Sequence, residues 1–177
     1  MRDAQGAIDE LTHRRDQLER EILALLPGSP SSTQAGRLRC RRGVDTLTAA
    51  GLCAEIGDFE RFARPGQLMS YVGLTPSEST TGEQRRLGSI TKTGSGHARR
   101  LLVEAAWHYR KRPQVGTTLT ARQDGQPPEA IAVACSAQRR LHRVWKRLKQ
   151  RAKRRTIIAV AAARELAGFC WAITQIE

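Results

Sequence analysis

The chain has 177 residues, of which 40% are hydrophobic and 5% aromatic, a length that fits one medium-sized domain or two small ones. Its formal net charge of +13 favours anionic partners, with nucleic acid first and an anionic membrane surface as the alternative. No stretch of eighteen residues is continuously apolar and the N-terminus carries charges of both signs, so we expect a cytoplasmic protein without a membrane span or signal peptide. The four cysteines are far apart with no histidine at ligand spacing, which predicts reduced, mostly buried thiols.

Residues 1–26 are predicted to form a helix with an apolar seam. The seam follows a heptad pattern that Arg15 interrupts, and its members are Ile8, Leu11, Leu18, Ile22 and Leu25. A run rich in proline, glycine and serine then ends the helix. The seam either pairs with another chain or folds back on its own domain. We expect a linker or dimerisation helix over 1–30, and a homo-oligomer formed through residues 8–25.

Residues 34–74 are predicted to form three short helices separated by glycine-containing turns. The stretch GVDTLTA (43–49) resembles a helix-hairpin-helix turn, in which glycines expose backbone N–H groups that grip a phosphate. Asp45 stands where the second glycine of that pattern is expected; its carboxylate would cap the helix but repel a phosphate. The turn therefore has two interpretations, a DNA contact and a purely structural connection.

The stretch PSESTTGEQRRLGSITK (76–92) combines hydroxyl side chains, glycines and cations and lacks apolar periodicity. We expect a loop there. Three roles fit such a loop: a solvated linker, a phosphate-binding surface, or the carrier of a nucleophilic hydroxyl. A hydroxyl attacks phosphorus only where a base or a lowered pKa activates it and cations neutralise the phosphoryl oxygens. The cations available nearby are Arg85, Arg86, Lys92, Arg99 and Arg100.

The C-terminal half is predicted to be a basic helical bundle. Helices are expected over 97–111, 129–152 and 156–174, with a polar connector over 113–128. From Arg139 to Arg155, ten of seventeen residues are Lys or Arg, and apolar residues at helical spacing interrupt them. A basic helix face of this kind suits a phosphate backbone of DNA or RNA. Its leading candidates for that contact are Arg139, Arg140, Arg143, Lys146 and Arg147. The predicted fold class is all-α: a coiled-coil-like helix, a helix-hairpin-helix-like unit over 34–74, and the basic bundle.

The acidic residues are scattered, and no common metal-hydrolase or phosphate-loop motif occurs. We therefore expect no cofactor in this chain.

Ala54–Arg110 resembles the C-terminal domain of the insertion sequence 110 family of transposases. The elements that carry the resemblance are Gly-Leu-Thr-Pro, Arg-Arg-x-Gly, Ile-Thr-Lys and Arg-Arg-Leu-Leu, in that order, and it extends from about residue 37 to 173. The resemblance implies a DEDD-type recombinase in which a RuvC-like domain holds metal-binding acids and the C-terminal domain supplies a serine nucleophile that forms a covalent protein–DNA intermediate. Family members of the best-known kind are guided by a bridge RNA, and the helix between their domains helps dimerisation. DNA, a structured guide RNA and a second copy of the chain are the partners implied.

This sequence departs from the family pattern in two places. The RuvC-like domain is absent, so Mg²⁺ is expected only together with that domain, and we expect a truncated copy that is inactive alone. The family's serine falls on Thr80, with Ser79 one position earlier, so Thr80 and Ser79 are the candidate catalytic residues. The alternative is a non-catalytic fragment that binds DNA or RNA or dimerises.

Overall fold

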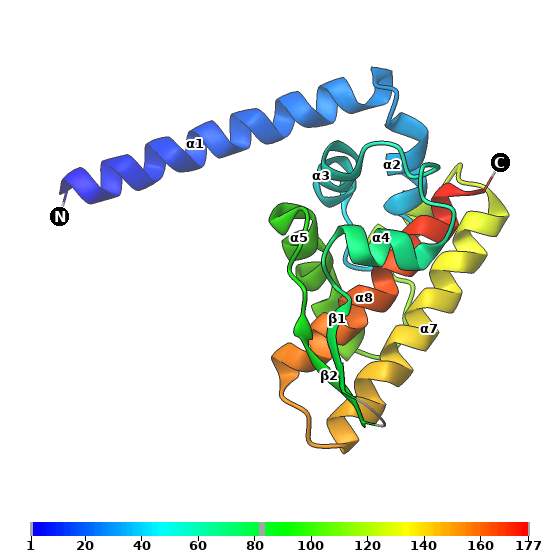
Figure 1. Ribbon diagram of the computed structural model, residues 1–177. Coiled ribbons are helices and arrows are strands. Elements are labelled where there is room, and N and C mark those ends of the chain that lie inside the picture. The colour runs from blue at the N-terminus through cyan, green and yellow to red at the C-terminus, as the bar shows by residue number, and fades with distance from the viewer. Residues whose placement is uncertain (1, 82–83, 177) are drawn as a thin grey trace.

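The chain is described by a computed structural model that covers residues 2–81 and 84–176, with only the backbone described for 2–3 and 79–87. Its architecture is all-α, as the sequence predicts, apart from one small two-stranded sheet in the described residues (Figure 1). The elements in chain order are α1 (Arg2–Leu25), η1 (Leu26–Gly28), α2 (Ser32–Leu38), α3 (Thr46–Ile56), α4 (Pro65–Tyr71), β1 (Pro76–Thr81), β2 (Gln84–Ile90), α5 (Gly96–Ala106), η2 (Trp107–Arg110), α6 (Thr117–Gln123), α7 (Pro128–Gln150) and α8 (Arg155–Thr174).

The last helix, α8, lies at the centre of the bundle and packs against α2, α4, α5 and α7 (Figure 1). Small residues on α8 allow this close approach, because a Cβ on Gly168 would lie 2.5 Å from Cε of Met69. Among the described residues, α8 is long and apolar enough to cross a membrane by length and composition alone. The sequence-based expectation was that no membrane span occurs. The fully buried residues of α8 include Ile158, Leu166 and Ile173, and this packing assigns α8 to the protein core.

Four long-range hydrogen bonds join the N-terminal part of the bundle to the C-terminal end of the chain. The guanidinium of Arg41, which is fully buried, donates to the carbonyl of Phe169 and, at 3.4 Å, to Sγ of Cys170. Arg37 donates to the carbonyl of Ile176, and the indole of Trp171 donates to the carbonyl of Phe62 at 2.7 Å. Buried charged groups are tolerated only with such partners, so these bonds help to hold the segment after α2 against the end of α8.

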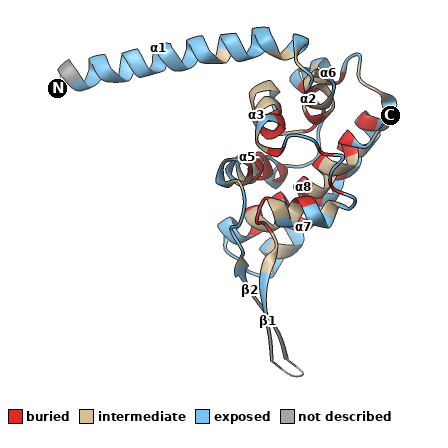
Figure 2. Cartoon of the chain, turned by 45° about the horizontal axis from the view of Figure 1, so that its top comes forward, coloured by how far each residue is buried: buried red, intermediate tan, exposed pale blue. Residues whose placement is uncertain are grey.

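The first helix, α1, extends away from the bundle and is exposed along most of its length (Figures 1 and 2). The helix predicted over 1–26 is observed over Arg2–Leu25. The predicted seam is exposed: Ile8, Leu11, Leu18, Ile22 and Leu25 have exposed fractions of 56, 68, 50, 43 and 73%. The seam therefore does not fold back along its own domain, although the C-terminal part of α1 reaches α3.

Two segments differ from the sequence-based expectation. The expected loop over 76–92 contains the antiparallel strands β1 and β2, which the β-branched residues Thr80, Thr81 and Ile90 favour. The expected connector over 113–128 contains α6, which tertiary contacts hold in place. Arg122 donates to the carbonyl of Val44 at 2.6 Å and Gln123 to the carbonyl of Cys40 at 3.0 Å.

All four cysteines are free thiols, and Cys40, Cys53 and Cys170 are buried, which confirms the prediction. Burial raises the pKa of Cys53 to about 11, so this thiol stays protonated at neutral pH.

Candidate nucleic-acid interface

The hydroxyl-rich segment forms a β-hairpin whose register brings predicted site positions together. Ser79 pairs with Arg86 and Thr80 pairs with Arg85 across the antiparallel ladder. The ladder is irregular between Pro76 and Glu78, where the register shifts. The side chains of Ser79, Thr80, Arg85 and Arg86 lie outside the described part, so the structure places these four residues by backbone register alone.

The two ends of the hairpin segment cross in very close contact at its root. Gly73 and Gly94 both have a positive φ, of 66° and 69°. A Cβ on Gly73 would lie 2.2 Å from the carbonyl oxygen of Thr93, and one on Gly94 would lie 1.7 Å from that of Tyr71. Backbone bonds from Thr91 N to Thr75 O (2.9 Å) and from Lys92 N to Gly73 O (3.1 Å) close the crossing. Both glycines are therefore required by backbone conformation and by space.

Arg99 on α5 fastens the same root. Its Nη1 atom donates to the carbonyl of Val72 at 3.0 Å and to that of Thr93 at 3.1 Å, so one guanidinium holds both ends of the hairpin segment. Arg99 was predicted to contact phosphate. In the structure its side chain binds the backbone of the hairpin root. Its neighbour Arg100 is exposed on α5, and Lys92 is exposed at the root with a positive φ of 58°.

The α7 cationic face consists of the five predicted residues of that helix, all exposed: Arg139, Arg140, Arg143, Lys146 and Arg147. The opposite side of α7 is buried through residues such as Leu141 and Trp145, so the helix is held with its charges outward. Arg140 is the member that already has a carboxylate partner, because its Nε lies 2.7 Å from Oε2 of Glu165 on α8. The five α7 positions thus lie on one helix face. Among the described residues, Arg100 forms no hydrogen bond or ion pair with them.

A cavity of about 800 Å³ lies where the hairpin root meets the C-terminal half of α7 and the first half of α8. We call it the hairpin groove. Lys92 from the root and Arg147 from the α7 cationic face both line it, so these two predicted positions meet at one site. The sequence pattern does not predict this groove, because the hairpin root lies more than fifty residues before the parts of α7 and α8 that form its other walls.

A hydrogen-bonded cluster of Glu55, Ser95 and His97 joins α3 to the start of α5. Ser95 caps α5 by accepting from Ala98 N at 3.0 Å and donates to Oε2 of Glu55 at 2.5 Å. Nδ1 of His97 lies 2.9 Å from Oε1 of the same carboxylate. The bond from Ser95, and after it the bond from His97, holds the pKa of Glu55 below its ordinary value. This cluster fixes the helix that carries Arg99. The Gly94-Ser95-Gly96 sequence signalled the helix start but not the partnership with Glu55.

The helix-hairpin-helix-like turn is occupied by internal contacts. The carboxylate of Asp45 accepts from Thr48 N at 2.8 Å and so caps α3. Gly43 has a φ of 79°, and a Cβ there would lie 2.5 Å from the carbonyl oxygen of Ala105. These contacts account for both residues as parts of a structural connection. The prediction of a DNA contact at this turn has no measured support and stays a prediction.

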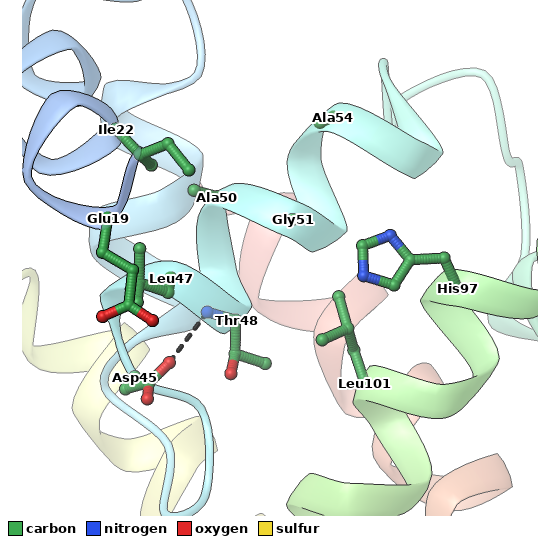
Figure 3. Close-up of a pocket in the computed structure, with 10 residues that line it drawn as sticks. All are labelled: Glu19, Ile22, Asp45, Leu47, Thr48, Ala50, Gly51, Ala54, His97 and Leu101. Atoms are coloured by element: carbon green, nitrogen blue, oxygen red, sulfur yellow. Dashed lines mark hydrogen bonds between the residues drawn. The ribbon is translucent and has the colours of Figure 1, made fainter. Parts of the chain in front are cut away.

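A second cavity, of about 430 Å³, opens between α1, α3 and α5 (Figure 3). Ile22 of α1, Ala50 and Gly51 of α3, and Leu101 of α5 give it an apolar lining, and His97 lies at one side. Its floor is shaped by Gly51, where a Cβ would lie 2.9 Å from Leu101. The cavity marks the place where α1 leaves the bundle.

No group of three or more His, Cys, Asp or Glu side chains suited to a metal ion occurs among residues 2–81 and 84–176. The part of the chain that the structure describes therefore offers no donor set for a metal-assisted step of its own.

Comparisons with known proteins agree with the resemblance read from the sequence. Residues 35–119 match the family described as Transposase IS116/IS110/IS902. A putative transposase, y4qE of Sinorhizobium fredii, is 39% identical over 91% of this chain and 41% of its own length. The transposase for insertion sequence element IS1533 of Leptospira borgpetersenii is 31% identical over 77% of this chain and 40% of its own length.

The transposase for insertion sequence element IS1328 of Yersinia enterocolitica is 26% identical over 93% of this chain and 42% of its own length. The chain thus spans about two fifths of the length of these curated relatives. Residues 35–119 are thus similar to the IS116/IS110/IS902 transposase family, and the three relatives named above are described as transposases.

Proposed function

We propose that this chain acts in DNA transposition as the nucleic-acid-binding part of a transposase, over residues 34–176, and that its hairpin carries the hydroxyl for strand cleavage and joining. The observation that supports this most is the hairpin register, which pairs Thr80 with Arg85 and Ser79 with Arg86. Directly paired positions of an antiparallel ladder lie on one face of the sheet, so a hydroxyl position and a cationic position are neighbours. The crossing at Gly73 and Gly94 gives this hairpin a fixed base.

The proposed chemistry is a transesterification. The hydroxyl oxygen of Thr80, or of Ser79, attacks the scissile phosphorus and forms a P–O bond to the protein, while one P–O bond within the DNA strand breaks. The attacking side-chain hydroxyl loses its proton and the leaving DNA oxygen takes one up, so a free DNA hydroxyl is released. Attack by a DNA hydroxyl on the phosphoprotein ester then forms a new P–O bond in DNA, breaks the P–O bond to the protein and returns a proton to the side-chain oxygen, which joins strands. Arg85 and Arg86 would neutralise the phosphoryl oxygens. The acidic domain of the family would supply Mg²⁺ in the assembled enzyme.

Binding to DNA is tested first by a salt titration with duplex DNA, single-stranded DNA and structured RNA. A variant with all five residues of the α7 cationic face changed to glutamine is compared with a control in which Arg14, Arg15 and Arg20 of α1 are changed. We expect the slope of log K against log salt on duplex DNA to become shallower by up to about 4 in the first variant and to stay unchanged in the control. Equal slopes in wild type and both variants would refute a binding role for α7. A preference for the structured RNA would support a guide RNA as the partner.

The nucleophile is tested by assembling the chain with the acidic domain of a relative, Mg²⁺ and a DNA substrate, and searching for a covalent adduct by mass spectrometry. We expect Thr80→Ser to increase the adduct yield, because the threonine methyl group crowds in-line attack. Thr80→Val should abolish it if Thr80 reacts, and Ser79→Ala should abolish it if Ser79 reacts. Absence of any adduct, even with Thr80→Ser, would reject the catalytic role and leave the binding role standing.

A second candidate function is self-association through α1, in the segment 1–30. The observation that favours it is the row of exposed apolar residues on α1, where Leu11 is 68% and Leu18 50% exposed. The change Leu11→Glu with Leu18→Glu should convert an oligomer to a monomer in sedimentation velocity. The control is Gln5→Glu with Gln17→Glu, at exposed polar positions of the same helix. A wild-type chain that sediments as a monomer would remove this candidate.

A further inference from the structure

We propose that the hairpin groove binds an unpaired nucleotide of the DNA strand, next to the bond that the hairpin would cleave. This inference rests on the proposed function and adds to it the form of the DNA that the site takes. An unpaired nucleotide presents a flat, weakly polar base together with a phosphate. The groove offers a matching pair of surfaces, an apolar floor and a cationic rim.

The floor of the groove is apolar and open to solvent. Ile157 on α8 lines the groove and is 52% exposed, so part of the apolar floor is in contact with solvent. Val144 and Leu148 of α7, Val160 of α8, and Leu74 and Ile90 of the hairpin segment complete the apolar lining. The volume of about 800 Å³ lies within the range of about 300–1,000 Å³ that small-molecule sites occupy, so the groove has room for a nucleotide.

The rim of the groove carries three cationic side chains. Lys92, Arg147 and Arg164 line it, and no ion pair links any of the three to a carboxylate within the described part of the chain. The carboxylate on the rim, Glu165, is paired with Arg140 at 2.7 Å and so repels a phosphate less than a free carboxylate would. The hydroxyl residues Ser89 and Thr156 also line the groove and can bond to the polar edge of a base.

The surroundings favour a nucleic-acid strand over other amphipathic anions. The rim continues through Arg147 into the α7 cationic face and, beyond the end of α7, into the basic run that reaches Arg155. A continuous path of cations suits a polyanion that passes through the groove. A base inside a duplex has its faces covered by its neighbours, so only an unpaired base can lie on an apolar floor.

The inference is tested by fluorescence anisotropy with three probes of one sequence: a duplex, the same duplex with four unpaired nucleotides at its centre, and a single strand. Two groove variants are used, Ala161→Trp, which fills the space beside α8, and Ile157→Gln, which makes the floor polar. We expect wild type to bind the unpaired probe about tenfold more tightly than the duplex. Both variants should bring that ratio near one while duplex affinity stays constant.

A charge comparison on the same surface sharpens the test. The groove triple variant changes Lys92, Arg147 and Arg164 to glutamine, and the control triple variant changes Arg139, Arg143 and Lys146, which do not line the groove. On the single strand, the groove triple should lower the salt slope by about 2, since each lost phosphate contact removes about 0.7. The control triple should weaken the duplex and the unpaired probe equally and leave their ratio at the wild-type value. Circular dichroism and thermal melting confirm that each variant folds.

Each outcome decides between the two proposals. Equal wild-type affinities for duplex and unpaired probes, unchanged by Ala161→Trp and Ile157→Gln, would overturn the groove inference and leave DNA binding by α7 intact. Failure of the wild type to bind any of the three probes would overturn both. Displacement of the unpaired probe by phosphatidylglycerol vesicles in wild type but not in Ala161→Trp would assign the groove to a lipid and overturn the inference.

Discussion

Gly94 shows how much the hairpin root depends on single residues. The change Gly94→Ala forces a residue with a Cβ into a φ of 69° and against the carbonyl of Tyr71. We expect the free energy of unfolding to fall by at least about 2 kcal/mol, since backbone strain costs about 1–3 kcal/mol and a displaced carbonyl adds to it. Urea denaturation followed by circular dichroism measures the loss. Gly125→Ala is the control, because Gly125 has the same φ of 69° but open space around it. Equal losses in the two variants would show that the crossing at the root is not tight.

Arg99 and Arg100 allow a matched comparison of two adjacent arginines. Arg99→Gln removes a charged donor from the carbonyls of Val72 and Thr93. We expect a loss of roughly 2 kcal/mol in the free energy of unfolding and faster hydrogen exchange in β1 and β2. Arg100→Gln, at an exposed position, should change stability by less than about 0.5 kcal/mol. If hydrogen exchange in the hairpin were the same in both variants, Arg99 would not be the residue that holds the root.

At the scale of elements, the Glu55 cluster that joins α3 to α5 makes the free energy of unfolding depend on pH. The pKa of Glu55 is lowered in the folded chain by its bonds from Ser95 and His97. A lowered pKa stabilises the fold above the ordinary glutamate value of about 4.3, and this contribution disappears as pH falls through the folded value. We therefore expect wild type to exceed Glu55→Gln in urea midpoint at pH 7, and the two to converge as pH falls below the ordinary glutamate pKa and through the lowered pKa of Glu55.

The control for that experiment is Glu104→Gln, at an exposed position of α5. Its midpoint should follow that of wild type across the whole pH range. A gap between wild type and Glu55→Gln that stayed constant as pH fell from 7 through the acid range would contradict the role given to the carboxylate, since its charge is lost on the way.

The elements also show what periodicity can and cannot predict. The long helices α1 and α7 were predictable because each carries an apolar stripe at helical spacing, and α8 because it is a long, mostly apolar run. The helix α6 was missed because its position depends on bonds from Arg122 and Gln123 to distant carbonyls. The hairpin was predicted to be a loop because its sequence lacks an alternating apolar pattern. The candidate positions Thr80 and Ser79 do not depend on this difference, since they rest on the resemblance and not on secondary structure, and they stay a prediction.

At the scale of the whole molecule, Arg41 connects the first third of the bundle to the last helix. Arg41→Met keeps much of the volume but leaves the carbonyl of Phe169 without its donor in the core. We expect the free energy of unfolding to fall by roughly 2–4 kcal/mol, the range for breaking a buried hydrogen-bonded contact. The urea midpoint of Arg41→Met is compared with that of Arg39→Met, which removes a half-buried arginine whose side chain makes no hydrogen bond within the described residues. Similar midpoints for the two variants would show that the buried contact adds no net stability.

The central place of α8 has a consequence for how the protein is made. A chain emerging from the ribosome presents α2, α3, α4 and α5 well before the helix on which α2, α4 and α5 pack. Until α8 follows, the apolar surfaces of these helices remain open to chaperones and proteases. A nonsense mutation or frameshift before Arg155 therefore yields a polypeptide that cannot complete its core, instead of a shorter working domain. A late lesion in the reading frame would silence this protein as completely as an early one.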